Sequence, residues 1–98
     1  MRQGYKILSE HGEGYDYEVE KDGKVIFIEV KGLSSDVDDI TLTEKETRKA
    51  LDERENYWVM VVARIPNSPE IYIVKDPASE IDKIVTPKSR IKQGEKWD

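Results

Sequence analysis

Two alternating segments joined by Asp22-Gly23 constrain the fold of this 98-residue chain more than any other feature. Residues 15–20 read YDYEVE and residues 24–31 read KVIFIEVK, so apolar and polar side chains alternate in both segments. Such alternation is typical of β-strands, and Asp-Gly between two of them indicates a two-residue hairpin turn. The turn fixes the register, because it places Lys21 opposite Lys24. The sequence therefore predicts an antiparallel hairpin with defined cross-strand pairs.

This register sorts the side chains onto two faces of the hairpin. One face carries no charge and is expected to meet the core; its members are Tyr15, Tyr17, Val19, Ile26, Ile28 and Val30. The other face mixes charged and apolar side chains, so we expect it to be partly covered as well; its members are Asp16, Glu18, Glu20, Val25, Phe27, Glu29 and Lys31.

The same register places Asp16 directly opposite Glu29. Two like charges in that position repel each other and destabilise the hairpin unless something compensates. Three explanations stay open: full exposure to solvent, protonation of one carboxyl group, or a divalent cation between the two. Mg²⁺ binds carboxylate oxygens, and Lys31 on the same face could hold a metal-bound water or stabilise developing negative charge. A charged, solvent-facing strand remains the alternative to a site.

Further strands are predicted on either side of this hairpin. Residues 4–9 read as a short strand, followed by a loop at 11–14. The almost continuously apolar run at 57–65 indicates a central strand buried on both faces, with Tyr57 and Trp58 in the core. A turn near 67–69 leads to a strand at 70–75.

One main helix is predicted between these strands. Thr43 and Glu46 form a capping-box pattern, and the helix should run to about Arg54. Residues 78–84 favour one or two helical turns, whereas residues 86–98, with Trp97, should form an irregular tail. We therefore expect one domain over 1–98 of the α/β (α+β) class: a mixed β-sheet with one helix packed on a face.

Composition excludes several classes of site and location. The chain has no cysteine, which rules out disulfides and cysteine nucleophiles, and its net charge of −5 argues against a strong sequence-independent grip on DNA. We find no run of 18 apolar residues and no signal peptide, so we expect no membrane span and a cytoplasmic protein.

Five stretches carry a resemblance to a known family. They are GYD at 14–16, IEVKG at 28–32, LTEKE at 42–46, NYWVMVV at 56–62 and KDP at 75–77. In this order they resemble the PD-(D/E)xK nuclease superfamily, in its Mrr-like branch, and most closely the family named for the C-terminal domain of the plant protein NO VEIN. The superfamily core is a sheet whose hairpin carries D and ExK.

The resemblance implies a restriction-endonuclease-like core that hydrolyses DNA phosphodiesters with Mg²⁺ or Mn²⁺. Asp16, Glu29 and the backbone carbonyl of Val30 would bind the metal, and Lys31 would position the attacking water. The first helix of that core, which often supplies another acidic residue, has no counterpart among the elements expected here. The chain would then be a fragment of a longer protein or a domain that lost the helix. Glu10, Glu13 and Glu18 are the candidate substitutes, and the choice among them stays open.

Other residues have two interpretations that stay open. Glu46 is either the partner of the Thr43 cap or an auxiliary acidic group at the site. Lys45, Arg48 and Lys49 either contact DNA phosphates or form a salt-bridged surface with neighbouring acidic residues.

Two functions remain open as well. The domain is a nuclease module of a restriction or repair protein with helicase, ATPase or methyltransferase parts, or an inactive nuclease-fold module that binds nucleic acid or a partner protein. A dimer through an exposed sheet edge is compatible with both.

Overall fold

The structure is a computed structural model of the chain that describes residues 4–32, 39–63, 69–80, 89–92 and 95–96. Its elements follow the chain in this order: β1 (Lys6–Gly12), β2 (Tyr15–Lys21), β3 (Lys24–Gly32), β4 (Asp39–Leu42), α1 (Glu44–Glu53), η2 (Arg54–Asn56), β5 (Tyr57–Ala63), β6 (Glu70–Lys75), η3 (Pro77–Glu80), β7 (Ser89–Lys92) and β8 (Glu95–Lys96).

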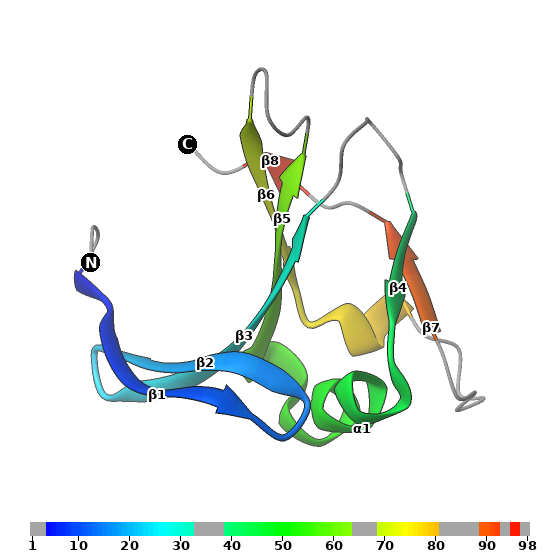
Figure 1. Cartoon of the computed structure of the whole chain (residues 1–98). Helices are drawn as coiled ribbons and strands as arrows, with labels where there is room; N and C mark the ends of the chain where they lie inside the picture. The colour runs from blue at the N-terminus through cyan, green and yellow to red at the C-terminus, as the bar shows by residue number, and fades with distance from the viewer. Residues whose placement is uncertain (1–3, 33–38, 64–68, 81–88, 93–94, 97–98) are drawn as a thin grey trace.

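A six-stranded mixed sheet forms the body of the fold, in the order β1-β2-β3-β5-β6-β8. Strands β3 and β5 run parallel, whereas the other neighbouring pairs in this sheet are antiparallel. Strands β4 and β7 pair separately, and Figure 1 shows them on the same side of the sheet as α1. The expected α+β class, a mixed sheet with one main helix, is confirmed.

Strands β2 and β3 are joined by Asp22 and Gly23, whose φ angles are 54° and 81°. Two successive positive φ angles match the twist of a two-residue hairpin. The paired register runs from Lys21 opposite Lys24 to Tyr17 opposite Ile28. Asp16 therefore lies one residue beyond the last pair of this ladder.

Strand β5 lies between β3 and β6, as its apolar sequence predicts. Tyr57, Val59, Val61 and Ala63 are completely buried, and Trp58 is 9% exposed. Residues of β5 thus contribute to both faces of the sheet, and the prediction that Tyr57 and Trp58 belong to the core is confirmed.

Hydrophobic clusters lie on both faces of the sheet. On the side of α1 the buried residues are Ile40, Leu42, Ala50, Tyr57, Val59, Val61 and Val74. On the opposite side they are Tyr5, Val19, Ile26, Ile28 and Trp58.

The predicted face of Tyr15 is wrong, because Tyr15 packs with Phe27 on the α1 side, at 4.8 Å between ring centroids. Tyr15 lies outside the paired register of β2 and β3. Its ring instead folds over Gly12, where an added Cβ atom would lie 2.0 Å from Cζ of Tyr15.

Helix α1 begins with the predicted capping box. The Thr43 hydroxyl accepts a hydrogen bond from the Glu46 N–H at 3.2 Å, and the Glu46 carboxylate accepts one from the Thr43 N–H at 2.9 Å. Buried Thr47 and Ala50 face the core, and η2 follows the end of the helix at Glu53. The cap therefore fixes the side chain of Glu46 at the start of α1.

Two local expectations differ from the structure. The loop expected at 11–14 is shorter, because β1 continues to Gly12 through its pairing with β2 and only Glu13 and Gly14 remain as a turn. In the tail, 89–92 and 95–96 are not irregular: they form β7 against β4 and β8 against β6. Strands β4 and β6 supply the backbone hydrogen-bond partners for these segments, and the weak sequence pattern of the tail does not predict this pairing.

Several sequence expectations fall partly outside the described residues. The turn at 67–68, residues 81–84 of the expected helical segment, and Trp97 belong to that group. Within the described part of 78–84, η3 covers residues up to Glu80.

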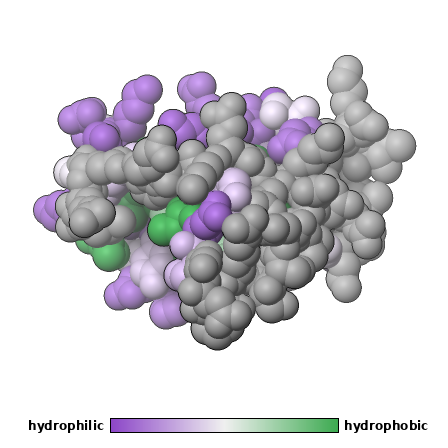
Figure 2. Space-filling view, turned by 90° about the horizontal axis from the view of Figure 1, so that it is seen from above, coloured by the Kyte–Doolittle hydropathy of each residue, from purple (hydrophilic) through white to green (hydrophobic). Residues whose placement is uncertain are grey.

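Hydrophilic side chains dominate the described surface in Figure 2, and hydrophobic ones show only in small patches. This agrees with a chain in which 38% of residues are charged. Among the described residues, no helix is long and apolar enough to cross a membrane.

Candidate functional site

Asp16 bonds to the backbone of β3. Its Oδ2 atom accepts a hydrogen bond from the Val30 N–H at 2.8 Å. The sequence places Asp16 opposite Glu29, and the side chain reaches the next residue of β3 where the regular pairing with β2 has ended. The carboxylate is thereby fixed beside the segment that carries Glu29 and Lys31.

Glu29 is a buried carboxyl group within the sheet. It is 6% exposed and lies next to Val59 of β5 in the parallel register. Val59 belongs to the hydrophobic cluster on the α1 side, so Glu29 is in an environment where an ionised carboxylate is costly. Such a position is unusual for a residue without a function or a partner.

Lys31 connects β3 to the start of α1. Its Nζ atom lies 2.7 Å from Oε1 of Glu46 and 3.4 Å from Oε2 of Glu29. The same Oε1 atom of Glu46 accepts the hydrogen bond from the Thr43 N–H. Glu46 thus caps the helix and also holds Lys31, so the two interpretations of Glu46 are not exclusive. Asp16, Glu29, Lys31 and Glu46 are called the acidic cluster below.

The pKa of Glu29 is raised from its ordinary value of 4.5 to about 8. Burial is the largest cause; a hydrogen bond to Glu46, the charge of Glu46 and the charge of Asp16 act in the same direction. Lys31 opposes the shift, but its 3.4 Å contact with Glu29 does not outweigh the loss of hydration. With the residues present, Glu29 therefore holds a proton at neutral pH.

The pKa values of Lys31 and Glu46 are shifted in the direction opposite to the one that burial favours. Burial disfavours the charge of Lys31, yet the hydrogen bond and charge of Glu46, with Glu29, raise the pKa of Lys31 above 10.5. Burial also disfavours ionised Glu46, but hydrogen bonds from Lys31 and the Thr43 backbone lower the pKa of Glu46 below 4.5. Lys31 and Glu46 are consequently a charged pair at neutral pH.

The hydrogen bond of the Tyr57 hydroxyl was not predicted from the sequence. This hydroxyl group is buried and donates a hydrogen bond to the Gly14 carbonyl at 2.8 Å. Burial, followed by the charges of Glu29, Glu46 and Asp16, raises the pKa of Tyr57. Its only sequence signal is an aromatic residue with a polar end at the start of a buried strand.

A protein-family model described as Protein NO VEIN, C-terminal, matches residues 3–74 of the chain. The chain belongs to this family. No curated protein matches the chain, and no solved structure matches it. The matched segment contains all four residues of the acidic cluster.

Two further candidate residues of the domain lie on the hairpin. Glu18 accepts a hydrogen bond from the Ser9 hydroxyl at 2.8 Å, which links β2 to β1. Val30, whose carbonyl the resemblance names as a ligand, lies in β3 between Glu29 and Lys31. Glu18 is thus engaged with the neighbouring strand, and Val30 is part of the segment that carries the acidic cluster.

The predicted phosphate contacts of the domain lie on α1. Lys45 pairs with Glu13 at 3.1 Å, Lys49 pairs with Glu53 at 3.3 Å, and Arg48 pairs with Glu44. Lys49 also lies over the ring of Phe27, at 4.0 Å from its centroid. These cations therefore form the salt-bridged surface that the sequence left open, and this does not test a role in DNA binding.

The donors of the acidic cluster suit a hard divalent cation by their chemistry. Carboxylate oxygens are the ligands that Mg²⁺ and Mn²⁺ accept, and a cation beside Glu29 would offset the burial and the neighbouring negative charges that raise its pKa. In the described ranges, however, no three His, Cys, Asp or Glu side chains come together in an arrangement that could hold a metal ion. The described residues therefore offer suitable donor atoms for such a cation, but these donors are not arranged as a complete ligand set.

Proposed function

We propose that this domain is a metal-dependent nuclease-type module that hydrolyses DNA phosphodiesters. The observation that supports it best is the burial of Glu29 beside Lys31, with Asp16 and Glu46 around them. A buried carboxyl group with a strongly raised pKa, next to a lysine, is typical of functional sites. The family match covers the same segment.

In this proposal, Asp16, Glu29 and the Val30 carbonyl would hold Mg²⁺ or Mn²⁺. The bound ion would supply Lewis acidity and an activated water. The raised pKa of Lys31 keeps its ammonium group protonated, so Lys31 orients a water and stabilises negative charge instead of accepting a proton. Glu46 positions Lys31 through their 2.7 Å contact.

The proposal extends to the context of the domain. A chain with a net charge of −5 is a weak general DNA binder, so partner domains of a larger protein would deliver the substrate. We propose helicase, ATPase or methyltransferase parts of a restriction or repair protein for this role.

A second candidate function is an inactive module that binds nucleic acid or a partner protein. It is favoured by the pairing of Lys31 with Glu46, and by the lack of an assembled three-carboxylate ligand set in the part of the chain that the structure describes. This function predicts binding without cleavage under any divalent ion.

Plasmid nicking in Mn²⁺ or Mg²⁺ separates the two functions. The nuclease proposal predicts cleavage by the wild type that is lost in Lys31→Met and in Asp16→Asn. Lys24→Met is a matched control, because Lys24 is an exposed lysine on the same strand, seven residues from Lys31 or about 23 Å of extended chain. Equal nicking by Lys31→Met and Lys24→Met would remove the catalytic assignment, and no nicking with any ion would favour the inactive module.

A further inference from the structure

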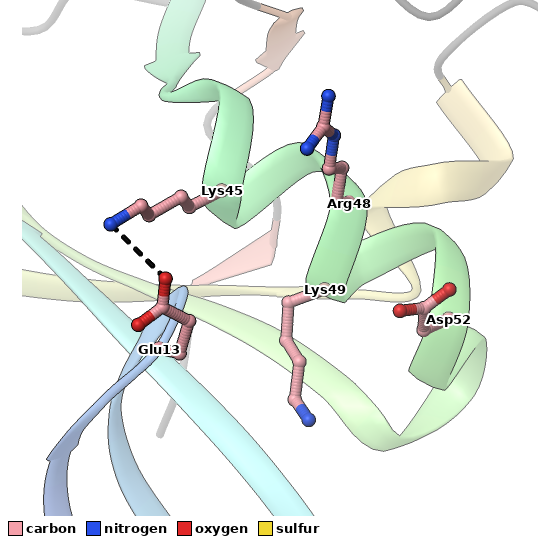
Figure 3. A pocket seen from close by; sticks show the side chains of 5 residues that line it. All are labelled: Glu13, Lys45, Arg48, Lys49 and Asp52. Carbon is pink, nitrogen blue, oxygen red and sulfur yellow. Dashed lines mark ion pairs between the residues drawn. The ribbon is translucent and has the colours of Figure 1, made fainter.

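An open hollow of about 360 Å³ lies between α1 and the β1–β2 turn. Three cationic side chains of α1, Lys45, Arg48 and Lys49, line it together with Asp52 and with Glu13 of the turn. Figure 3 shows Lys45 reaching from α1 across to Glu13, while Arg48 and Lys49 leave the helix in other directions.

The hollow adjoins the acidic cluster through Gly14. An added Cβ at Gly14 would lie 2.6 Å from the Lys45 carbonyl oxygen and 3.0 Å from Cβ of Lys49, so the turn touches α1 there. Gly14 is two residues from Asp16 in the chain, and Lys45 directly precedes Glu46. The Gly14 carbonyl also accepts a hydrogen bond from the Tyr57 hydroxyl at 2.8 Å. The β1–β2 turn with the start of β2, and the first turn of α1, therefore carry residues of both the hollow and the acidic cluster.

The cations of the hollow can exchange their partners at little cost. Lys45 and Glu13 form their 3.1 Å ion pair with side chains that are 71% and 80% exposed. Arg48 pairs with Glu44 on the same helix, and both side chains are largely exposed. Exposed pairs of this kind contribute little to stability, so an anion with several oxygens can replace either carboxylate.

Lys49 differs from these two residues. It lies over Phe27 and Tyr15, at 4.0 and 5.4 Å from their ring centroids, and its side chain is 24% exposed. Its charge is therefore held by aromatic contacts and by Glu53, whereas Lys45 and Arg48 can follow a ligand.

We propose that this hollow binds a phosphodiester group of the nucleic-acid strand that reaches the acidic cluster, and that Glu13 competes with this phosphate for Lys45. The inference rests on the proposed function, because a nuclease site at the acidic cluster makes a nucleic-acid phosphate the expected anion. A phosphate bound by Lys45 and Arg48 would anchor the strand beside the cluster. Glu13 would weaken the binding of this phosphate, because the strand has to displace the Glu13 carboxylate from Lys45 before the phosphate can bind.

Binding without cleavage tests this site separately from the chemistry. Fluorescence anisotropy of a labelled single-stranded oligonucleotide in EDTA, over a salt series, gives affinity and its salt dependence. Lys45→Gln and Arg48→Gln should each weaken binding and reduce the slope of log K against log salt by about 0.7. Glu13→Gln should bind about two- to fivefold more tightly, the range that an exposed ion pair supports.

Lys24→Gln is the control, because it removes the same charge at the far turn of the hairpin and should leave the salt slope unchanged. Competition with inorganic phosphate distinguishes a strand from a free ion: phosphate that displaces the oligonucleotide at equal concentration would overturn the assignment to a strand. Lack of binding by the wild type, or unchanged slopes in Lys45→Gln and Arg48→Gln, would overturn the site.

These outcomes are independent of nicking. Reduced slopes of log K against log salt in Lys45→Gln and Arg48→Gln support the site even when the wild type does not cleave DNA. In that case only the proposed function fails. Cleavage by the wild type with unchanged slopes in the variants supports the proposed function and overturns the site.

Discussion

The ammonium nitrogen of Lys31 lies 2.7 Å from Oε1 of Glu46, although the two residues are 15 positions apart in the chain. One residue lies in a central strand and the other in the first turn of the helix that covers it. The contact therefore fixes α1 relative to β3 and keeps the lysine beside Glu29.

Lys31→Met should destabilise the fold at neutral pH, because Glu46 loses its cationic partner and Glu29 faces an unopposed carboxylate. A hydrogen bond to a charged group contributes about 1.5–3 kcal/mol. Urea unfolding at pH 7 measures the loss, with the exposed Lys24→Met as control. Equal unfolding midpoints for the two variants would show that the Lys31–Glu46 contact contributes no stability.

Stability should fall with rising pH on account of Glu29. The folded state keeps the proton of Glu29 up to about pH 8, whereas the unfolded chain releases it near 4.5. The contribution is thus complete below about pH 4.5 and is lost as the pH rises through about 8. Glu46 and Lys31 have pKa values displaced below 4.5 and above 10.5, outside this window.

Glu29→Gln provides the test, because glutamine resembles the protonated carboxyl group at every pH. Urea unfolding in EDTA at pH 5, 7 and 9 should show a smaller decline of the unfolding free energy in Glu29→Gln than in the wild type. Parallel declines for the two proteins would contradict the buried, protonated carboxyl group.

Millimolar Mn²⁺ or Mg²⁺ should raise the melting temperature of the wild type. A ligand specific for the folded state stabilises it by about 1.4 kcal/mol at ten times its Kd, which corresponds to roughly 5–10 °C for a domain of this size. Asp16→Asn should respond less, yet be at least as stable without the ion, because the amide oxygen can still accept the Val30 N–H while one repelling charge is gone.

Calorimetry with and without the ion distinguishes the outcomes. The same shift in the wild type and Asp16→Asn would exclude Asp16 as a ligand. Flat melting temperatures for both proteins would remove the physical support for a metal at the acidic cluster.

Gly14→Ala should destabilise the fold and separate the β1–β2 turn from α1. Gly14 has a φ of 80°, and its added Cβ would meet the Lys45 carbonyl oxygen at 2.6 Å. Gly23→Ala is a matched control, with a φ of 81° and nothing within 4 Å of the added Cβ. Both variants lose about 1 kcal/mol from backbone strain, and Gly14→Ala should lose roughly 1–3 kcal/mol more. Equal losses in thermal unfolding would show that the contact with α1 is unimportant.

Features with local causes could be read from the sequence. The pairing from Lys21–Lys24 to Tyr17–Ile28 follows from the geometry of a two-residue turn, and the Thr43–Glu46 cap involves groups three residues apart. The central position of β5 follows from its composition, since an uninterrupted apolar strand has to be covered on both sides.

The candidate site was only partly predictable, because its contacts join residues that are far apart in the chain. Alternation placed Glu29 and Lys31 on one face, but not under α1, and the sequence offered Glu46 as a cap or a site residue without showing that one oxygen serves both contacts. The Tyr57–Gly14 hydrogen bond joins residues 43 positions apart, and no local signal announces it.

The sequence by itself determined the hairpin, the helix start, the buried strand and the identity of the charged residues, because turns, caps and alternation depend on neighbours within a few positions. Only the tertiary structure decided that Glu29 is buried, that Tyr15 turns to the α1 side and that two strands form in the tail. Each of these depends on which distant surface covers the residue and removes water from it. Burial of that kind changes a carboxyl group from a surface charge into a proton-holding member of the acidic cluster.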